Sequence, residues 1–159
     1  MTAEAVGLAV DRGVDPLKPR AHIARLLQPQ MLLEANLILT MTRDHRRQVV
    51  EMLPAALRRT LTIREFSRLA AQMPNMDSRP IAANASAPDE ALKRFESALA
   101  LLVSLRGLVG GPATASDDDV VDPFGRSMAT YERSAAELDP GLLAVERFVN
   151  AVTRPDSVI

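Results

Sequence analysis

The sequence contains no cysteine and no tryptophan, and aromatic residues make up only 3% of it. The absence of cysteine excludes disulfide bonds, thiolate metal ligands and a cysteine nucleophile within these residues. Because aromatic side chains are so few, we expect a core built mainly from Leu, Val, Ile, Ala and Met.

The chain also lacks a dominant charge and a long apolar run. Its formal net charge is −1, so the field around the whole molecule is weak and predicts no general affinity for nucleic acid or anionic membranes. No apolar stretch reaches the length of a membrane span, and the start, Met1 to Glu4, lacks the basic and apolar regions of a signal peptide. We therefore expect a cytoplasmic protein.

What the chain does contain is typical of one globular domain. It has 159 residues, of which 47% are hydrophobic and 25% are charged. A chain of this length fits a single domain, which we place over residues 1–159. No glycine-rich nucleotide-binding motif and no Gly-x-Ser-x-Gly nucleophile motif occurs.

Two short segments have the pattern of buried strands. Residues 37–41 form a nearly continuous apolar run, and residues 59–63 alternate and contain β-branched side chains. A strand without polar positions is typical of a parallel sheet that is covered on both faces. Together with the helical patterns around them, these strands predict an α/β fold with more helix than so small a sheet requires.

Helices are expected before, between and after these strands. Thr42 is a candidate N-cap, Pro29 suits a first helical turn, and Gly13 suits a helix end. Ser86 and Asp89 form a possible capping box before an apolar face made by Leu92, Phe95, Leu99 and Leu102. The expected helices cover residues 3–11, 29–36, 43–53 and 64–72, a segment following Ser86, and two helices after residue 125.

The remaining segments are expected to be irregular. Asp15-Pro16 and Lys18-Pro19 mark a loop, and residues 22–27 form a short extended segment. Residues 73–88 are rich in Pro, Asn, Ser and Ala, and residues 107–119 form a flexible connector whose acidic end keeps it soluble. That end consists of Asp117, Asp118 and Asp119.

Four stretches of the sequence resemble a known enzyme family. Gly13-Val14 followed by His22-Ile23-Ala24-Arg25 is similar to a "G-I … H-x-A-R-Q" segment, with Leu26 in place of Gln. Residues 36–41 are similar to a "D-x-I-L-x-M" strand, with Asn36 in place of Asp. Residues 42–69 resemble "M-T-R-E-H-R … R-T-F-T-L-R-E-F", and residues 121–125, followed by Tyr131, resemble a "D-P-Y/F-G" loop and its helix. Their order and spacing are those of the low-molecular-weight protein-tyrosine-phosphatase family in its bacterial form.

The resemblance runs from about residue 4 to residue 152, with a divergent insertion near residues 73–119. It implies the three-layer phosphotyrosine phosphatase I-like fold and hydrolysis of phosphotyrosine or a small aryl phosphate through a phosphocysteine. It also implies that Asp122 is the general acid and base, and that Phe124 lines the rim that receives the substrate. The chemistry requires no metal or other cofactor.

The family's central strand, its Cys-x5-Arg phosphate loop and a second strand have no counterpart in the sequence. The resemblance therefore implies an N-terminally incomplete domain that is inactive as this chain, since it lacks a nucleophile and a phosphate cradle. It also implies that the segment 37–41 is left as an open edge. We expect an incomplete form of a longer enzyme, self-association or partner binding at that edge, or a marginally folded chain.

Other interpretations of the same residues remain open. Asp122-Pro123-Phe124-Gly125 suits a type I turn with Asp122 in its first position. His22 and His45 fall at structural positions and show no metal-site spacing. A basic cluster is more typical of a solvated helix face than of an anion-steering surface. The cluster comprises Arg43, Arg46, Arg47, Arg58 and Arg59.

Three alternative functions also remain open. The first is a non-catalytic pseudophosphatase that acts as a binding or regulatory module. The second is an arsenate reductase of the same fold, which the lack of cysteine disfavours. The third is a mainly helical interaction protein unrelated to phosphatases, for which the absence of strands would be evidence.

Overall fold

The computed structural model describes residues 1–73 and 88–153. It contains a small parallel sheet of two strands, β1 (Ile38–Thr40) and β2 (Thr60–Thr62), within a mainly helical chain. Ile38 pairs with Thr60 and Thr40 with Thr62. The expected α/β class and parallel strand pair are confirmed, and each strand is one residue shorter at each end than expected. Because two strands are present, the absence of strands that would have been evidence for the mainly helical interaction protein is not observed.

The crossover between the two strands is helical. The helix α4 (Arg43–Met52) begins at Thr42, whose hydroxyl oxygen accepts a hydrogen bond from the His45 N–H at 3.1 Å. It is followed by a 3-10 helix, η1 (Pro54–Arg59), which the sequence pattern did not predict. The next helix, α5 (Ile63–Ala70), starts directly after β2 because the Thr62 hydroxyl accepts the Glu65 N–H at 3.0 Å. After each strand, the next helix therefore begins at a threonine whose side chain caps it.

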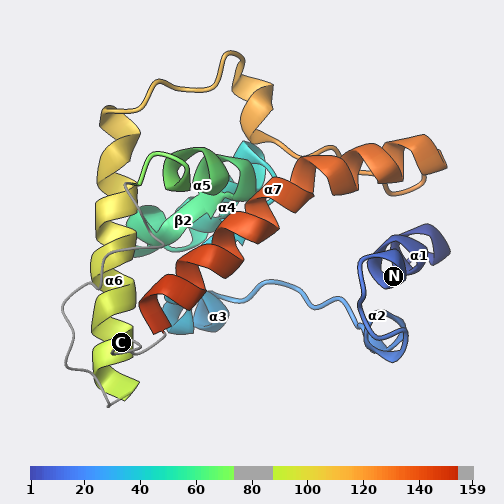
Figure 1. The fold of residues 1–159 in the computed structure, drawn as a ribbon, viewed down its shortest axis with the longest axis horizontal. Helices are drawn as coiled ribbons and strands as arrows, with labels where there is room; N and C mark the ends of the chain where they lie inside the picture. Colours follow the sequence, from blue (N-terminus) through green and yellow to red (C-terminus); the bar gives the residue numbers. More distant parts are fainter. Residues whose placement is uncertain (74–87, 154–159) are drawn as a thin grey trace, which may run out of the picture.

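The sheet is covered on both faces, as the apolar run 37–41 predicted. Ile38 packs against a small cluster formed by Leu32, Val49 and Ala56, on the face that carries α4 and η1. Leu39 and Leu61 belong to a larger core on the opposite face. That core is formed by α5 together with α6 (Pro88–Ser104) and α7 (Met128–Thr153). Figure 1 shows α7 crossing in front of α5, with α6 beside them.

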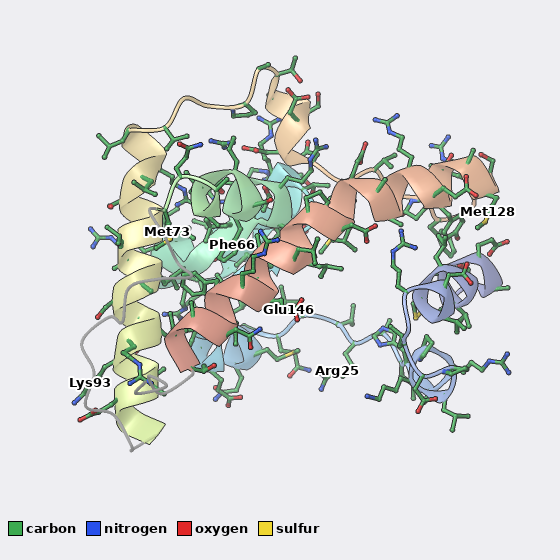
Figure 2. The ribbon with its side chains drawn as sticks, viewed as in Figure 1. Arg25, Phe66, Met73, Lys93, Met128 and Glu146 are labelled. Atoms are coloured by element: carbon green, nitrogen blue, oxygen red, sulfur yellow. The ribbon has the colours of Figure 1, made fainter. Side chains whose placement is uncertain are left out.

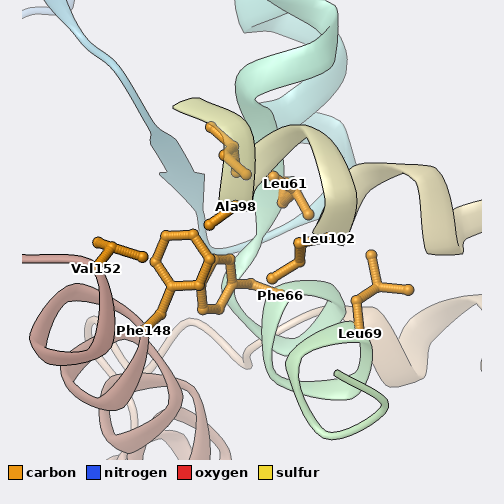
Figure 3. Packing of buried hydrophobic residues seen from close by; sticks show 8 residues of the cluster. Leu61, Phe66, Leu69, Ala98, Leu102, Phe148 and Val152 are labelled. Atoms are coloured by element: carbon orange, nitrogen blue, oxygen red, sulfur yellow. The ribbon is translucent and has the colours of Figure 1, made fainter. Parts of the chain in front are cut away.

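Phenylalanine rings connect the three helices of the larger core, and Figure 3 shows the contact between Phe66 and Phe148. Phe148 of α7 makes edge-to-face contacts with Phe66 of α5 and with Phe95 of α6, each with ring centroids 5.4 Å apart. Phe66 and Phe148 are fully buried. Such aromatic pairs contribute about 0.5–1.5 kcal/mol each beyond the burial of their area.

The first three helices form a separate run before the sheet. They are α1 (Ala3–Asp11), α2 (Leu17–Ala21) and α3 (Pro29–Glu34). The α2 helix corrects the expected loop, since the Asp15 carboxylate accepts the Leu17 N–H at 3.0 Å and starts a helical turn. Residues 22–27 pair with no strand and connect α2 to α3 (Figure 1). The guanidinium of Arg12 binds Asp139 at 2.9 Å, which fastens α1 to α7.

One long helix replaces the two that were expected after residue 125. The helix α7 has 26 residues and contains Pro140 in its interior. Proline removes one helical hydrogen bond and favours a bend, which is visible along α7 in Figure 1. The helix continues through this position because the residues on both sides of Pro140 are buried, with Tyr131 before it and Gly141 and Phe148 after it.

One further expectation about a side chain is wrong, and another concerns a residue outside the described part of the chain. Leu92 is 41% exposed and does not share the buried face of Leu99 and Leu102. Ser86, the proposed cap of α6, lies outside the described residues, as does most of the expected 73–88 loop. Among the helices that the structure describes, none has the length and apolar character to cross a membrane.

Gly141 of α7 lies close to Ile63, the first residue of α5. A methyl group at this position would overlap the Ile63 side chain and lie 3.0 Å from the Ile63 carbonyl oxygen. We expect Gly141→Ala to lower the free energy of unfolding by roughly 1–3 kcal/mol, because the crowded contact has to open. Urea unfolding followed by circular dichroism measures this change.

Gly7→Ala is the matched control for that variant. Gly7 lies inside α1, and no atom comes within 4 Å of the position that a methyl group would take there. Alanine should therefore be neutral or stabilising by up to about 1 kcal/mol through its helix propensity. Equal effects of the two substitutions on the free energy of unfolding would show that Gly141 is not in a crowded contact with Ile63.

Candidate functional site

The segment 118–122 lies across the carboxyl ends of both strands. The Val120 N–H donates to the carbonyl oxygen of Met41, the residue that follows β1, at 2.8 Å. The Arg64 guanidinium, just after β2, donates to the Asp119 carbonyl at 2.9 Å. The Asp119 side chain accepts the Arg43 N–H at 2.7 Å at the start of α4. Parallel α/β sheets commonly bind ligands at this end of the strands, so the segment is a candidate functional site.

Asp122 leads this segment into a tight turn whose register differs from the expected one. The Arg126 N–H donates to the Pro123 carbonyl at 2.9 Å, and Gly125 has a φ of 69° in the third position of that turn. A positive φ at this position is what a type II turn requires, and glycine adopts it without strain. The expected type I turn starting at Asp122 is therefore wrong by one residue.

The side chain of Asp122 starts the turn by a local hydrogen bond. Its Oδ1 accepts the Phe124 N–H at 3.0 Å, and the rest of the carboxylate is exposed to solvent. The ring of Phe124 is 76% exposed. The two residues that the sequence singled out are thus adjacent at the surface, available to a ligand or partner and not part of the core.

The acidic run before this segment is structural, which corrects the expectation that it only keeps a connector soluble. Asp118 is 7% exposed and pairs with the guanidinium of Arg68 at 3.0 Å. Asp117 accepts the Thr114 N–H, and hydrogen bonds from Thr114 lower the pKa of this carboxylate. A short 3-10 helix, η3 (Ala115–Asp118), occupies the end of the expected flexible connector, and another, η2 (Leu105–Gly107), occupies its start.

The basic cluster does not converge on a single point. Arg43 contacts Asp119, whereas Arg47 pairs with Asp44 and Glu51 on the surface of α4. Arg46 is half-buried and donates to the Thr60 carbonyl at 3.1 Å. The interpretation as a solvated helix face holds for Arg43 and Arg47 and is wrong for Arg46. It is wrong also for Arg59, which is half-buried and donates to the carbonyl of Leu32.

The two histidines are exposed and lie on different segments, His22 after α2 and His45 in the first turn of α4. Within residues 1–73 and 88–153, no group of three His, Asp or Glu side chains is close enough to hold a metal ion.

The sequence did not predict a buried cluster of charged side chains near the strands. Glu65 is 8% exposed and accepts two hydrogen bonds from Arg106, at 2.6 and 3.0 Å. Arg106 also donates to the Thr60 carbonyl at 2.9 Å, the same oxygen that Arg46 contacts. Burial lowers the pKa of Arg46, and the nearby charge of Arg106 lowers it further. The sequence signal available was Thr62-x-x-Glu65, which indicates a helix cap but not a distant arginine partner.

Glu137 anchors the candidate segment from the side of α7. Its Oε2 accepts the Val121 N–H at 2.8 Å, and its Oε1 accepts from Arg133 at 2.8 Å. Burial by itself would raise the pKa of Glu137, but the Val121 N–H, Arg133 and Arg64 outweigh it and lower the pKa below its ordinary value of 4.5. The carboxylate is thus held ionised beside the segment.

A cavity of about 500 Å³ lies next to Glu137 and is lined by side chains of both charges, including those of Arg64, Arg68, Arg133 and Asp118. Asp122 and Phe124 lie outside this lining. The arginine side chains that face the cavity form ion pairs with Asp118 or Glu137. These ion pairs support the segment 118–122.

Comparisons with known proteins identify no relative. No family model, no curated protein and no solved structure matches the chain.

The Glu137 anchor makes stability depend on pH. Because its pKa is lower in the folded chain, Glu137 stabilises the fold above its ordinary pKa of 4.5, and this contribution is lost as the pH falls through the folded value. We expect Glu137→Gln to lower the free energy of unfolding by about 1–3 kcal/mol near neutral pH and by much less in acid. Urea unfolding at a series of pH values tests this.

The control is Glu132→Gln, which changes an exposed carboxylate earlier in α7. It should leave both stability and its pH dependence nearly unchanged. A loss that is the same at every pH for Glu137→Gln would mean that packing, and not the charge of the carboxylate, supports the segment.

Proposed function

We propose that this chain is a low-molecular-weight protein-tyrosine-phosphatase-like domain that does not hydrolyse phosphomonoesters by itself. The parent reaction is hydrolysis of phosphotyrosine or a small aryl phosphate, in which Asp122 would act as the general acid and Phe124 would lie at the substrate rim.

One observation supports this proposal above the others. The Asp-Pro-Phe-Gly segment is tethered by the Val120 N–H to the residue after β1, at the carboxyl edge of a parallel strand pair. The resemblance implies an α/β fold in which this segment carries the general acid, and a position at the end of the strands is compatible with that role. The exposed carboxylate of Asp122 and the exposed ring of Phe124 are compatible with an acid and a rim residue.

The same geometry limits what the chain can do. A general acid contributes about 10²–10⁴-fold, and only to a substrate that another group has bound and attacked. The sequence has no cysteine to attack the phosphorus atom. Arg46, Arg64, Arg68 and Arg106 all donate to protein carbonyl or carboxylate oxygens, so none of them is arranged as a free phosphate clamp.

Hydrolysis of para-nitrophenyl phosphate tests the proposal. We expect no activity from the 159-residue chain above the buffer rate. Where the coding region upstream of Met1 supplies a Cys-x5-Arg loop, the extended chain should be active, and Asp122→Asn in that chain should lower kcat by about 10²–10⁴-fold.

Asp139→Asn is the matched control in the extended chain, since the Asp139 carboxylate hydrogen-bonds to Arg12 and not to the segment 118–122. It should retain nearly full kcat. Activity of the 159-residue chain alone would contradict the proposal that hydrolysis requires a cysteine thiolate. An upstream region without the Cys-x5-Arg pattern would contradict the proposal that a longer form of the chain is an active phosphatase.

A non-catalytic binding role is the second candidate, and the outer edge of β1 favours it. In the described part of the chain, β1 pairs with β2 alone. An unpaired strand edge offers backbone N–H and C=O groups to another chain, and both faces of β1 are covered, which keeps the strand ordered. We infer that residues 37–41 are where self-association or partner binding would occur.

Sedimentation velocity over a range of protein concentrations tests this second candidate, together with hydrogen exchange. Association through the edge should slow exchange of the amides of Ile38–Thr40 as dimers form, while the amides of α1 serve as the control. A chain that stays monomeric at every concentration, or a dimer that protects α1 and not β1, would argue against an interface at the strand edge.

A further inference from the structure

A second cavity lies at the opposite end of the sheet from the Asp122 segment. It has a volume of about 540 Å³ and lies between α3, η1 and α6. Asn36, two residues before β1, and Arg59, immediately before β2, are both in its lining. The cavity therefore belongs to the amino ends of the strands, and its lining shares no residue with the first cavity. In Figure 1, α3 and α6 lie next to each other on the side away from α1.

Most of the wall of this cavity is apolar. Leu33 comes from α3, and Leu99, Ala100 and Val103 come from successive turns of α6. Leu99 belongs to the main core and is 6% exposed, so the floor of the cavity is fixed by packing. A volume between about 300 and 1,000 Å³ with apolar walls and few polar groups is typical of sites for small ligands.

Two arginines supply the positive charge of the lining, whose other polar residues are Asn36, Glu96 and Ser104. Arg59 donates from Nη2 to the Leu32 carbonyl at 3.1 Å, but its Nε–H is buried and has no hydrogen-bond partner among the described residues. Arg58 is exposed and lines the same cavity. No carboxylate in residues 1–73 or 90–153 forms an ion pair with either of them.

A buried donor without an acceptor is costly, and more so when it belongs to a charged group. Arg68 also has a buried Nε–H without a partner, but its charge is balanced by Asp118. The charge of Arg59 has no such balance in the described chain. An anion in the cavity would neutralise the guanidinium of Arg59, which lines it, and form charge-assisted hydrogen bonds, which are the strong ones.

We propose that this cavity binds a small amphiphilic anion, with one carboxylate or phosphate against Arg58 and Arg59 and an apolar body along Leu99 and Val103. Glu96 lies at the same cavity from the side of α6 and is exposed. Its charge opposes that of the ligand and reduces the affinity. The site is independent of the phosphatase-like function, because it lies at the other end of the strands from Asp122.

Isothermal titration of the full chain with three probes of equal chain length tests the proposal. Octanoate and octyl phosphate carry the anionic group, and octan-1-ol carries only the apolar body. We expect both anions to bind with one-to-one stoichiometry, and octan-1-ol to bind roughly tenfold or more weakly, because it cannot neutralise the arginines. The comparison of the two anions shows which head group the site prefers.

Four variants sharpen the test. Arg58→Gln should weaken anion binding several-fold, and Glu96→Gln should strengthen it, since the two changes move the charge of the lining in opposite directions. Ala100→Trp, at an exposed position of the lining, should abolish binding of all three probes by filling the cavity. Arg25→Gln, in the segment between α2 and α3, should change nothing.

Circular dichroism of each variant separates loss of binding from loss of fold, and none of these four positions is in the buried core. Three results would overturn the proposal: no binding of either anion to the folded chain, equal affinity for octan-1-ol and octanoate, or unchanged affinity in Ala100→Trp.

Discussion

The edge-to-face contacts of Phe148 hold the larger core together. In a chain with four phenylalanines, three of them meet there, and they come from α5, α6 and α7. Figure 2 shows Phe66 at the centre of the molecule, whereas Lys93 of α6 and Met128 at the start of α7 lie toward its periphery. Because α5 begins directly after β2, the contact between Phe66 and Phe148 also holds the strand ends in place. The candidate segment is hydrogen-bonded to residues at these strand ends. The small glycine at position 141 permits the approach of α7 to α5.

Ion pairs between charged side chains connect the elements outside the apolar core. Glu65 with Arg106 connects α5 to η2, Asp118 with Arg68 connects η3 to α5, and Glu137 with Arg64 connects α7 to α5. Each carboxylate is largely shielded from solvent and hydrogen-bonded. Buried pairs of this kind contribute little net stability compared with apolar packing, but removal of one partner is costly. They therefore fix where the segment 118–122 lies more than how strongly the chain folds.

The position of the Asp122 segment was partly predictable. Its turn was visible in Asp-Pro-Phe-Gly, and glycine at a positive φ explains the last residue of that motif. Its attachment was not predictable, because the partners of Val120 and Asp119 are Met41 and Arg43, which belong to a much earlier part of the chain. The roles of Asp117 and Asp118 were misjudged for the same reason. An acidic run carries no sign of which distant arginine it will meet, and Arg68 is 50 residues away from Asp118.

Local sequence determined the strands, the caps Thr42 and Thr62, the α/β class and the apolar faces, since these depend on residue periodicity and on hydrogen bonds between near neighbours. Tertiary structure alone decided that α7 continues through Pro140, that Leu92 stays exposed, and that Arg46 and Arg59 turn inward. For Pro140, Arg46 and Arg59, contacts with distant elements outweigh the local preference. A proline costs one hydrogen bond, whereas the buried residues on both sides of it hold the helix axis in place.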